Sequence, residues 1–147
     1  MLRRYLMSVF VVLLLAFQPA TLGLAATRAD WVQFIADVTV PDGTRLAPNT
    51  AFTKTWRVKN IGTATWTTAY KLVFVSGERM GAPESVDLPH NLAPGEMIDL
   101  TVNMSAPATP GVYRGNWLLE NASGQAVGLG AAAASPFWVE IISTAQY

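Results

Sequence analysis

The chain contains no cysteine among its 147 residues. Disulfide bonds are therefore excluded, although small secreted domains often depend on them when their cores are small. A fold built from this sequence must be held together by packing alone. The length suits one domain that is large enough to bury most of its apolar surface.

An excess of charge of one sign is also lacking. Ten lysines and arginines balance ten aspartates and glutamates, so the formal net charge is zero. Nucleic-acid binding depends on neutralising phosphates, and binding to anionic lipid needs a cluster of basic residues. We therefore expect neither nucleic acid nor an anionic lipid surface as a partner.

Residues suited to catalysis or metal binding are few. His90 is the only histidine, and it lies in DLPHNLAPGE between proline and glycine signals, where we expect an exposed turn. No nucleophile-elbow glycines flank a serine, and the carboxylates stand singly rather than in the pattern of an EF-hand. The sequence predicts no catalytic residue, no metal site and no cofactor. An enzymatic role would require a partner chain to complete a site.

A long apolar run occurs only at the amino terminus. Arg3 and Arg4 precede the run 5–17, and small residues follow at 23–25. Basic residues, a short apolar region and small residues in this order are typical of a secretory signal peptide, which we place at 1–26. The alternative is a retained membrane anchor, but the run is well short of the roughly 20 residues that span a bilayer. The protein is expected to be secreted or held in the cell envelope.

Cleavage of this leader predicts a mature chain that begins near Ala26 or Thr27. The intact mass of the exported protein measures the position of the new amino terminus. A mature protein that still carries residues 1–25 would contradict the assignment and favour the membrane anchor.

The remaining chain is punctuated by turn signals. PDG at Pro41, NIG at Asn60 and NASG at Asn121 separate segments with strand character. Short strands with this punctuation favour an all-β fold, here an antiparallel sandwich of about seven to eight short strands. The expected strands are 34–40, 52–59, 65–67, 70–75, 97–104, 112–121 and 137–142.

The segment 52–59 has the clearest anchor. Its apolar residues lie two apart, so Trp56 should point into the core while its neighbours point outward. Lys54 shares the buried parity, and we expect its long stem to cover apolar surface while its charge reaches water. Asn60 and Gly62 then provide residues that a tight reversal tolerates.

The same segment carries a family resemblance. KTWRVKNIGTATW, followed by PGVYRGNWLLENASG and FWVEI, resembles the immunoglobulin-like four-tryptophan domain, which is the central domain of the Next-to-BRCA-one autophagy receptors and also occurs in bacterial proteins. The resemblance covers roughly 37–142, and it assigns 37–143 to the domain, 27–36 to a linker or edge segment and 144–147 to a tail. The family's tryptophans fall on Trp56, Trp66, Trp117 and Trp138.

This resemblance implies an immunoglobulin-like β-sandwich that binds another protein and has no catalytic activity. We expect Trp56 and Trp117 to fill the volume that a disulfide and its tryptophan occupy in other sandwiches. Tyr113, just after a Pro-Gly pair, resembles the tyrosine corner of such folds. Because the leader permits disulfides and none can form, a bacterial exported domain fits better than a eukaryotic extracellular one.

Three aromatic residues are candidates for binding. Trp138 has the parity opposite to the inferred core face, Trp66 lies in the threonine-rich TATWTT, and Tyr70 follows it. If they are exposed, they suit a protein segment or the ring of a sugar, so a polysaccharide-binding module is the alternative function. The other interpretation is that Trp66 and Trp138 close an end of the sandwich or pack under a loop. The alanine-rich stretch 128–137 is expected to be a loop, since four alanines cannot hold a helix alone.

Overall fold

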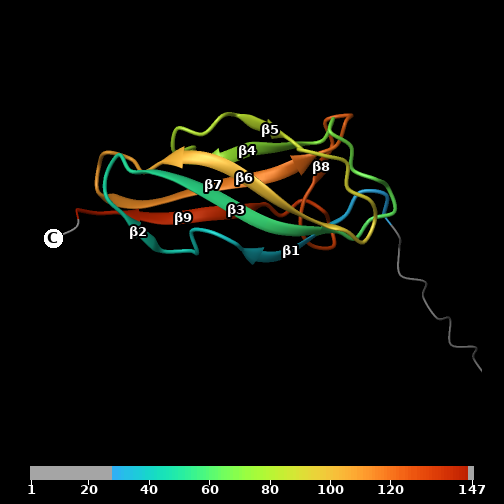
Figure 1. Cartoon of the computed structure of the whole chain (residues 1–147), viewed down its shortest axis with the longest axis horizontal. Coiled ribbons are helices and arrows are strands. Elements are labelled where there is room, and N and C mark those ends of the chain that lie inside the picture. Colours follow the sequence, from blue (N-terminus) through green and yellow to red (C-terminus); the bar gives the residue numbers. More distant parts are fainter. Residues whose placement is uncertain (1–27, 146–147) are drawn as a thin grey trace, which may run out of the picture.

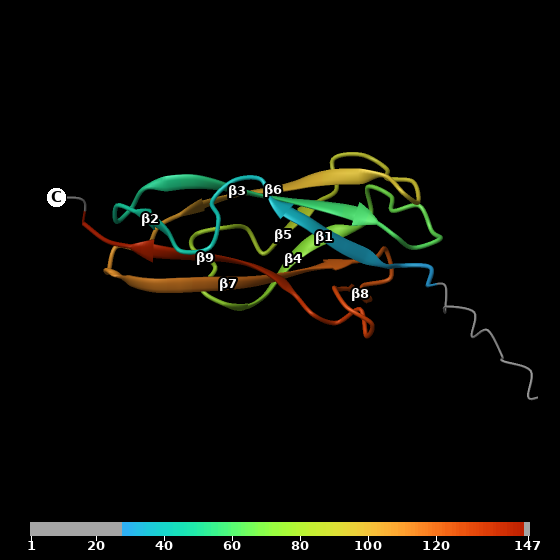
Figure 2. The same cartoon turned by 90° about the horizontal axis from the view of Figure 1, so that it is seen from below.

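The computed structural model describes residues 28–145, and they form two β-sheets packed face to face (Figures 1 and 2). The described residues contain strands and turns but no helix, so none of them forms a helix that could cross a membrane. The all-β sandwich predicted from the turn signals is confirmed. The proposed leader 1–26 lies outside the described residues.

The first sheet has three strands in the order β1-β3-β6, with antiparallel pairing throughout. The second has the order β2-β9-β7-β4-β5, and β8 pairs with β7. The bounds are β1 Val32–Asp37, β2 Thr44–Leu46, β3 Ala51–Asn60, β4 Lys71–Gly77, β5 Ser85–Asp87, β6 Met97–Ser105, β7 Gly111–Glu120, β8 Ala126–Val127 and β9 Phe137–Ser143.

The long strands overlap the segments that the sequence predicted, and the short strands were missed. β6 alternates strictly between buried Ile98, Leu100, Val102 and Met104 and exposed residues between them. Two or three residues are too few to show a period, which is why β2, β5 and β8 were not predicted. The predicted strand 65–67 is wrong, because only Trp66 makes an isolated bridge, to Leu92.

The segment between β1 and β2 crosses from one sheet to the other. β1 pairs with β3 in the first sheet, whereas β2 runs parallel to β9 in the second. Gly43 has φ of 77° and Val40 has φ of 51°. The left-handed conformation is ordinary for glycine but unfavourable for a β-branched residue, so neighbouring contacts must hold Val40 in place.

The reversal after β3 depends on a buried amide. The Asn60 side chain is fully buried; its Oδ1 accepts from the Gly62 N–H at 3.0 Å, and its Nδ2 donates to the Ala64 carbonyl at 2.9 Å. A Cβ on Gly62 would lie 2.2 Å from the Ala29 carbonyl oxygen. The predicted roles of Asn60 and Gly62 in a tight turn are therefore confirmed.

Two indole rings join the sheets. Trp56 on β3 and Trp117 on β7 are both fully buried, and their ring centroids lie 6.1 Å apart at an interplanar angle of 49°. Phe137 packs against Trp56 at 5.4 Å, and Phe74 against Trp117 at 5.5 Å. The predicted central contact is confirmed, and offset or tilted aromatic packing of this kind contributes beyond the area that it buries.

Tyr113 ties a loop to β7. Its ring is half-buried against the core, and its hydroxyl donates to the Thr109 carbonyl at 2.8 Å. A tyrosine hydrogen-bonded to backbone a few residues upstream is the tyrosine corner that the sequence predicted.

Replacing Trp117 with alanine tests the importance of the indole contact. Trp117→Ala should lower the free energy of unfolding by roughly 3–5 kcal/mol, because a buried aromatic is replaced by a cavity. Thermal melting should shift down by about 10 °C or more. Val112→Ala, on the same strand but 65% exposed, is the matched control and should melt with the wild type. A Trp117→Ala melting temperature within a few degrees of the wild type would contradict a central role.

Candidate functional site

Two of the three predicted binding residues lie inside the protein. Trp66 is fully buried and Tyr70 is 7% exposed, and their rings stack with centroids 6.3 Å apart. The bridge from Trp66 to Leu92 places the threonine-rich segment across the end of the sandwich. The indole of Trp66 therefore packs between the sheets as part of the core. Trp66 therefore closes an end of the sandwich, as one of the two interpretations of the sequence had it, and neither Trp66 nor Tyr70 presents a face to a ligand.

The Tyr70 hydroxyl has a structural partner. It donates to Asp30 Oδ1 at 2.7 Å. Burial, with the Asp30 hydrogen bond and charge as further causes, raises the pKa of Tyr70 to about 12. The phenol is therefore neutral at physiological pH and links the lead segment to the end of the sandwich.

Trp138 is the predicted residue that reaches the surface. It lies on β9 with 38% of its surface exposed, between buried Phe137 and Val139. Its Nε1 donates to Asp42 Oδ2 at 2.9 Å, and the Arg114 guanidinium lies 4.2 Å from the ring centroid. The hydrogen bond and the cation–π contact hold the indole in one orientation before any ligand arrives.

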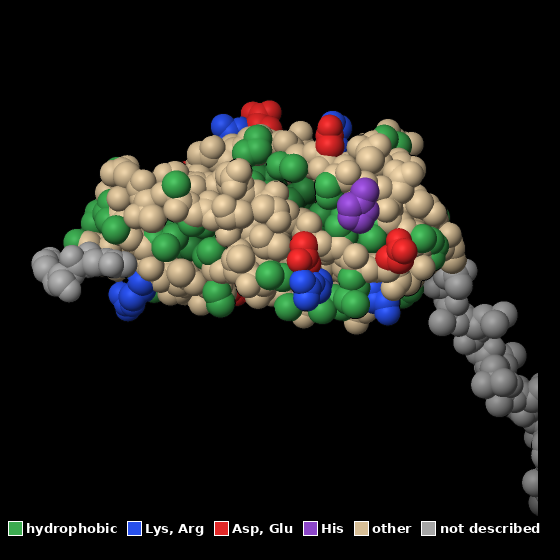
Figure 3. All heavy atoms as spheres, in the orientation of Figure 1, with side chains coloured by type: hydrophobic (Ala, Val, Ile, Leu, Met, Phe, Trp, Pro, Cys, Tyr) green, Lys and Arg blue, Asp and Glu red, His purple; other side chains and the backbone are tan. Residues whose placement is uncertain are grey.

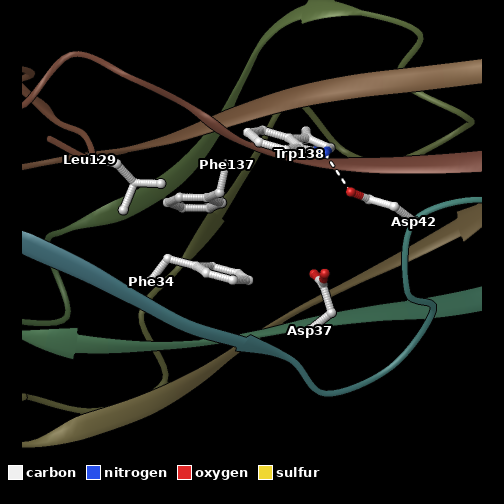
Figure 4. Close-up of a pocket in the computed structure, with 6 residues that line it drawn as sticks. All are labelled: Phe34, Asp37, Asp42, Leu129, Phe137 and Trp138. Atoms are coloured by element: carbon white, nitrogen blue, oxygen red, sulfur yellow. Dashed lines mark hydrogen bonds between the residues drawn. The ribbon is translucent and has the colours of Figure 1, made fainter.

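A pocket of about 140 Å³ opens beside Trp138, between the start of β9 and the edge strand β1 (Figure 4). Phe34, Leu129 and Phe137 form its apolar part, and Asp37 and Asp42 lie at the other end, with Trp138 between. Phe34 is 38% exposed. The pocket exists because β2 covers β9 only from Ile141 onward, which leaves the first residues of β9 open.

The side chain of Lys54 on β3 holds one of the pocket residues, Asp37, in place. The side chain is fully buried; its Nζ lies 2.6 Å from Asp37 Oδ1 and donates to the Val40 carbonyl at 2.7 Å. The expectation that its charge reaches water is therefore wrong. Two acceptors in the crossing segment replace water, and the ammonium also lies 5.5 Å from the Trp56 ring centroid. Lys54 thus holds the strained Val40 and orients Asp37 toward the pocket.

Both carboxylates keep an unused oxygen. Asp37 bonds Lys54 through Oδ1 and Asp42 bonds Trp138 through Oδ2. Within residues 28–145 the second oxygen of each has no hydrogen-bond partner. The polar end of the pocket can therefore accept hydrogen bonds from a ligand.

Sequence reasoning missed most of this pocket. Asp37 and Asp42 stand singly in the sequence and form no recognisable motif, and Phe34 was assigned only to a strand. The PDG turn at Pro41 was the available signal, because it places Asp42 where the chain changes sheets. Leu129 lies in the loop 128–136, whose path the composition did not specify.

Nothing in the described part of the chain resembles a metal centre. No group of three or more metal-binding side chains occurs there. His90 is exposed, and its Nδ1 lies 2.9 Å from the Asn91 carbonyl oxygen in a turn.

Replacing Lys54 or Asp37, the two members of the buried ion pair, should lower the free energy of unfolding by unequal amounts. Asp37→Asn leaves an ammonium buried without a counter-charge, which typically costs roughly 3–5 kcal/mol. Lys54→Met should cost less, because the carboxylate of Asp37 is 24% exposed and can be hydrated. The double variant should recover part of the loss, and denaturant unfolding of all four proteins measures the coupling. Glu84→Gln breaks the exposed pair with Arg79 and should cost less than about 1 kcal/mol. Equal effects of Asp37→Asn and Glu84→Gln would contradict this account.

Domains similar to this one occur in known proteins. The family model described as "Ig-like domain from next to BRCA1 gene" matches residues 39–142. Protein ILRUN of Danio rerio is 40% identical over 93 residues, which cover 63% of this chain and 32% of that protein. Protein JOKA2 of Solanum tuberosum is 42% identical over 99 residues, covering 65% of this chain and 12% of that protein. The Next to BRCA1 gene 1 protein of Homo sapiens is 36% identical over 111 residues, covering 74% of this chain and 11% of that protein. The matches thus span about a third or less of each relative.

Proposed function

Since the chain belongs to the family of Ig-like domains from next to BRCA1 gene, we propose that it is a non-catalytic protein-interaction module whose binding site is the Trp138 pocket. The observation that carries this proposal is the fixed orientation of a partly exposed indole. Asp42 holds the Trp138 N–H and Arg114 covers the ring, so little conformational entropy is lost when a partner binds. Tryptophan and arginine are also the residue types enriched at the energetic centres of interfaces.

The pocket selects the chemistry of its ligand. Its apolar part suits one medium-sized aliphatic or aromatic side chain, packed between Phe34 and Phe137. The free oxygens of Asp37 and Asp42 suit a neighbouring lysine or arginine. The expected ligand is therefore a short protein segment with an apolar residue next to a basic one. Because both carboxylates already have a partner, the basic residue of the ligand contributes mainly to the orientation of the bound segment and less to its affinity.

We further propose that this module works outside the cytoplasm, as an exported bacterial protein. Support for export comes from Arg3, Arg4 and the apolar run 5–17. Given export, the lack of cysteine favours a bacterial over a eukaryotic extracellular protein.

The carbohydrate-binding alternative is weakened by the burial of its platforms. Trp66 and Tyr70 lie inside the sandwich, and Arg114 covers one face of the Trp138 ring. Stacking of a sugar ring needs an exposed aromatic face, and these three residues offer little exposed aromatic surface.

Panning a library of random peptides against the purified protein tests the proposed function. The enriched peptides should share an apolar residue beside a basic one, and Trp138→Ala should weaken their binding about 30-fold, since loss of an interface hot spot costs roughly 2 kcal/mol. Val112→Ala, also exposed and on the neighbouring strand, should bind like the wild type. Circular dichroism verifies that both variants are folded. Peptides that bind Trp138→Ala and wild type equally would contradict the proposal. A glycan-array signal that Trp138→Ala abolishes would favour the alternative.

A further inference from the structure

The strand β6 forms an edge of the first sheet without the features that usually protect an edge. The other exposed edges are interrupted: β1 has a register shift between Phe34 and Ala36, and β2 and β5 have three residues each. β6 has nine residues, and it pairs with β3 from Met97 to Ser105 without a register shift. It contains no proline and no lysine, the residues that commonly blunt edges.

The free side of β6 can be assigned from two hydrogen bonds at its end. The Ser105 N–H donates to the Met80 carbonyl at 2.8 Å, away from β3, whereas the Ala106 N–H donates to Thr50 of the segment that leads into β3. Backbone groups alternate along a strand, so those of Asp99, Thr101 and Asn103 point the same way as Ser105. Within residues 28–145 β6 has β3 as its only strand neighbour. These three residues therefore present N–H and C=O groups to an open edge.

Space beside this edge is open. A cavity of about 260 Å³ lies between β6 and the segment around β5, lined by Leu72, Val86, Pro89 and Leu100 among others. β5 thus ends short of covering β6. Figure 3 shows the side of the molecule on which β6 lies, and charged side chains on it are few and scattered.

The single charge of β6 is compensated. Asp99 is the only charged residue in the strand, and Arg57 donates to both of its oxygens, at 2.7 Å from Nε and 2.8 Å from Nη2. The hydrogen bonds from Arg57 hold the pKa of Asp99 below its usual range. The carboxylate is therefore charged at physiological pH but already paired, and it repels an approaching strand less than a free one would.

We propose that β6 pairs antiparallel with β6 of a second copy of this chain, about a two-fold axis at Thr101. In this register Thr101 faces Thr101 of the copy, and each Asp99 faces Asn103, so no like charges meet. The three facing pairs all use the outward backbone groups identified above. Two three-stranded sheets then become one continuous sheet, as in other cases of strand addition. The self-complementarity of the sequence around Thr101 favours a second copy over an unrelated strand.

The absence of cysteine permits a direct test of this register. In a backbone-bonded antiparallel pair the facing Cα atoms lie about 5.5 Å apart, which is within the range of a disulfide. Thr101→Cys should therefore form a covalent dimer under mild oxidation. Thr53→Cys, on the same face but on the central strand β3, should stay monomeric on a non-reducing gel.

Sedimentation of the purified protein over a range of concentrations measures the association itself. The wild type should show a monomer–dimer equilibrium, and Thr101→Lys should weaken it at least about tenfold, since two lysines would face each other at the axis. Ala51→Lys, exposed on β3 and paired with Ser105 outside the three facing pairs, should associate like the wild type. Thr101→Lys should also keep its peptide binding at Trp138, which separates this test from that of the proposed function. A wild type that is monomeric throughout, or equal crosslinking of both cysteine variants, would overturn the pairing. So would a monomer that captures a foreign strand along β6.

Discussion

The contact between Trp56 and Trp117 connects the interior of this domain to its surface. One ring comes from β3 and the other from β7, so the contact joins the two sheets at their centre. Trp56 also uses its single N–H, which donates to the Trp138 carbonyl at 2.8 Å. The backbone that carries the exposed indole is thus fixed by a residue of the core. Trp117 has no such bond, because its Nε1 finds no acceptor among residues 28–145; it contributes through packing alone.

A second constraint lies in the crossing between the sheets. A buried ammonium is costly unless a counter-charge and hydrogen-bond acceptors surround it. Lys54 finds both in one short segment, the Asp37 carboxylate and the Val40 carbonyl. Apolar residues in its place would often be as stable, but they would not dictate where the crossing runs. We infer that the ion pair selects one conformation of the segment that carries Asp37 and Asp42, and through it the shape of the pocket.

The sequence was most informative about side-chain burial where a strand is long and has one solvent-exposed face. The alternation in 52–59 placed Trp56 in the core, although its neighbour Thr55 is buried as well, and the parity of Trp138 on β9 correctly predicted its exposure. Parity correctly placed Lys54 on the buried face. It does not show whether buried acceptors are available for the ammonium, so the expectation that the charge reaches water was wrong. Local composition left Trp66 open between a surface and a buried position, because its burial follows from the bridge to Leu92, which is distant in the sequence. The pocket joins β1, a turn, a loop and β9, and no local pattern reveals such a combination.

The positions of β1 and β6 have a consequence for how the domain acts. They lie on opposite sides of β3, and the Trp138 pocket adjoins β1. An assembly joined along β6 would therefore carry its two pockets at its far ends, both open to solvent. Such an assembly is bivalent, and a target that repeats the recognised segment could occupy both ends at once. Avidity can raise apparent affinity by roughly 10²–10⁴ without any new contact, so a weak individual site would suffice on a surface where targets are dense.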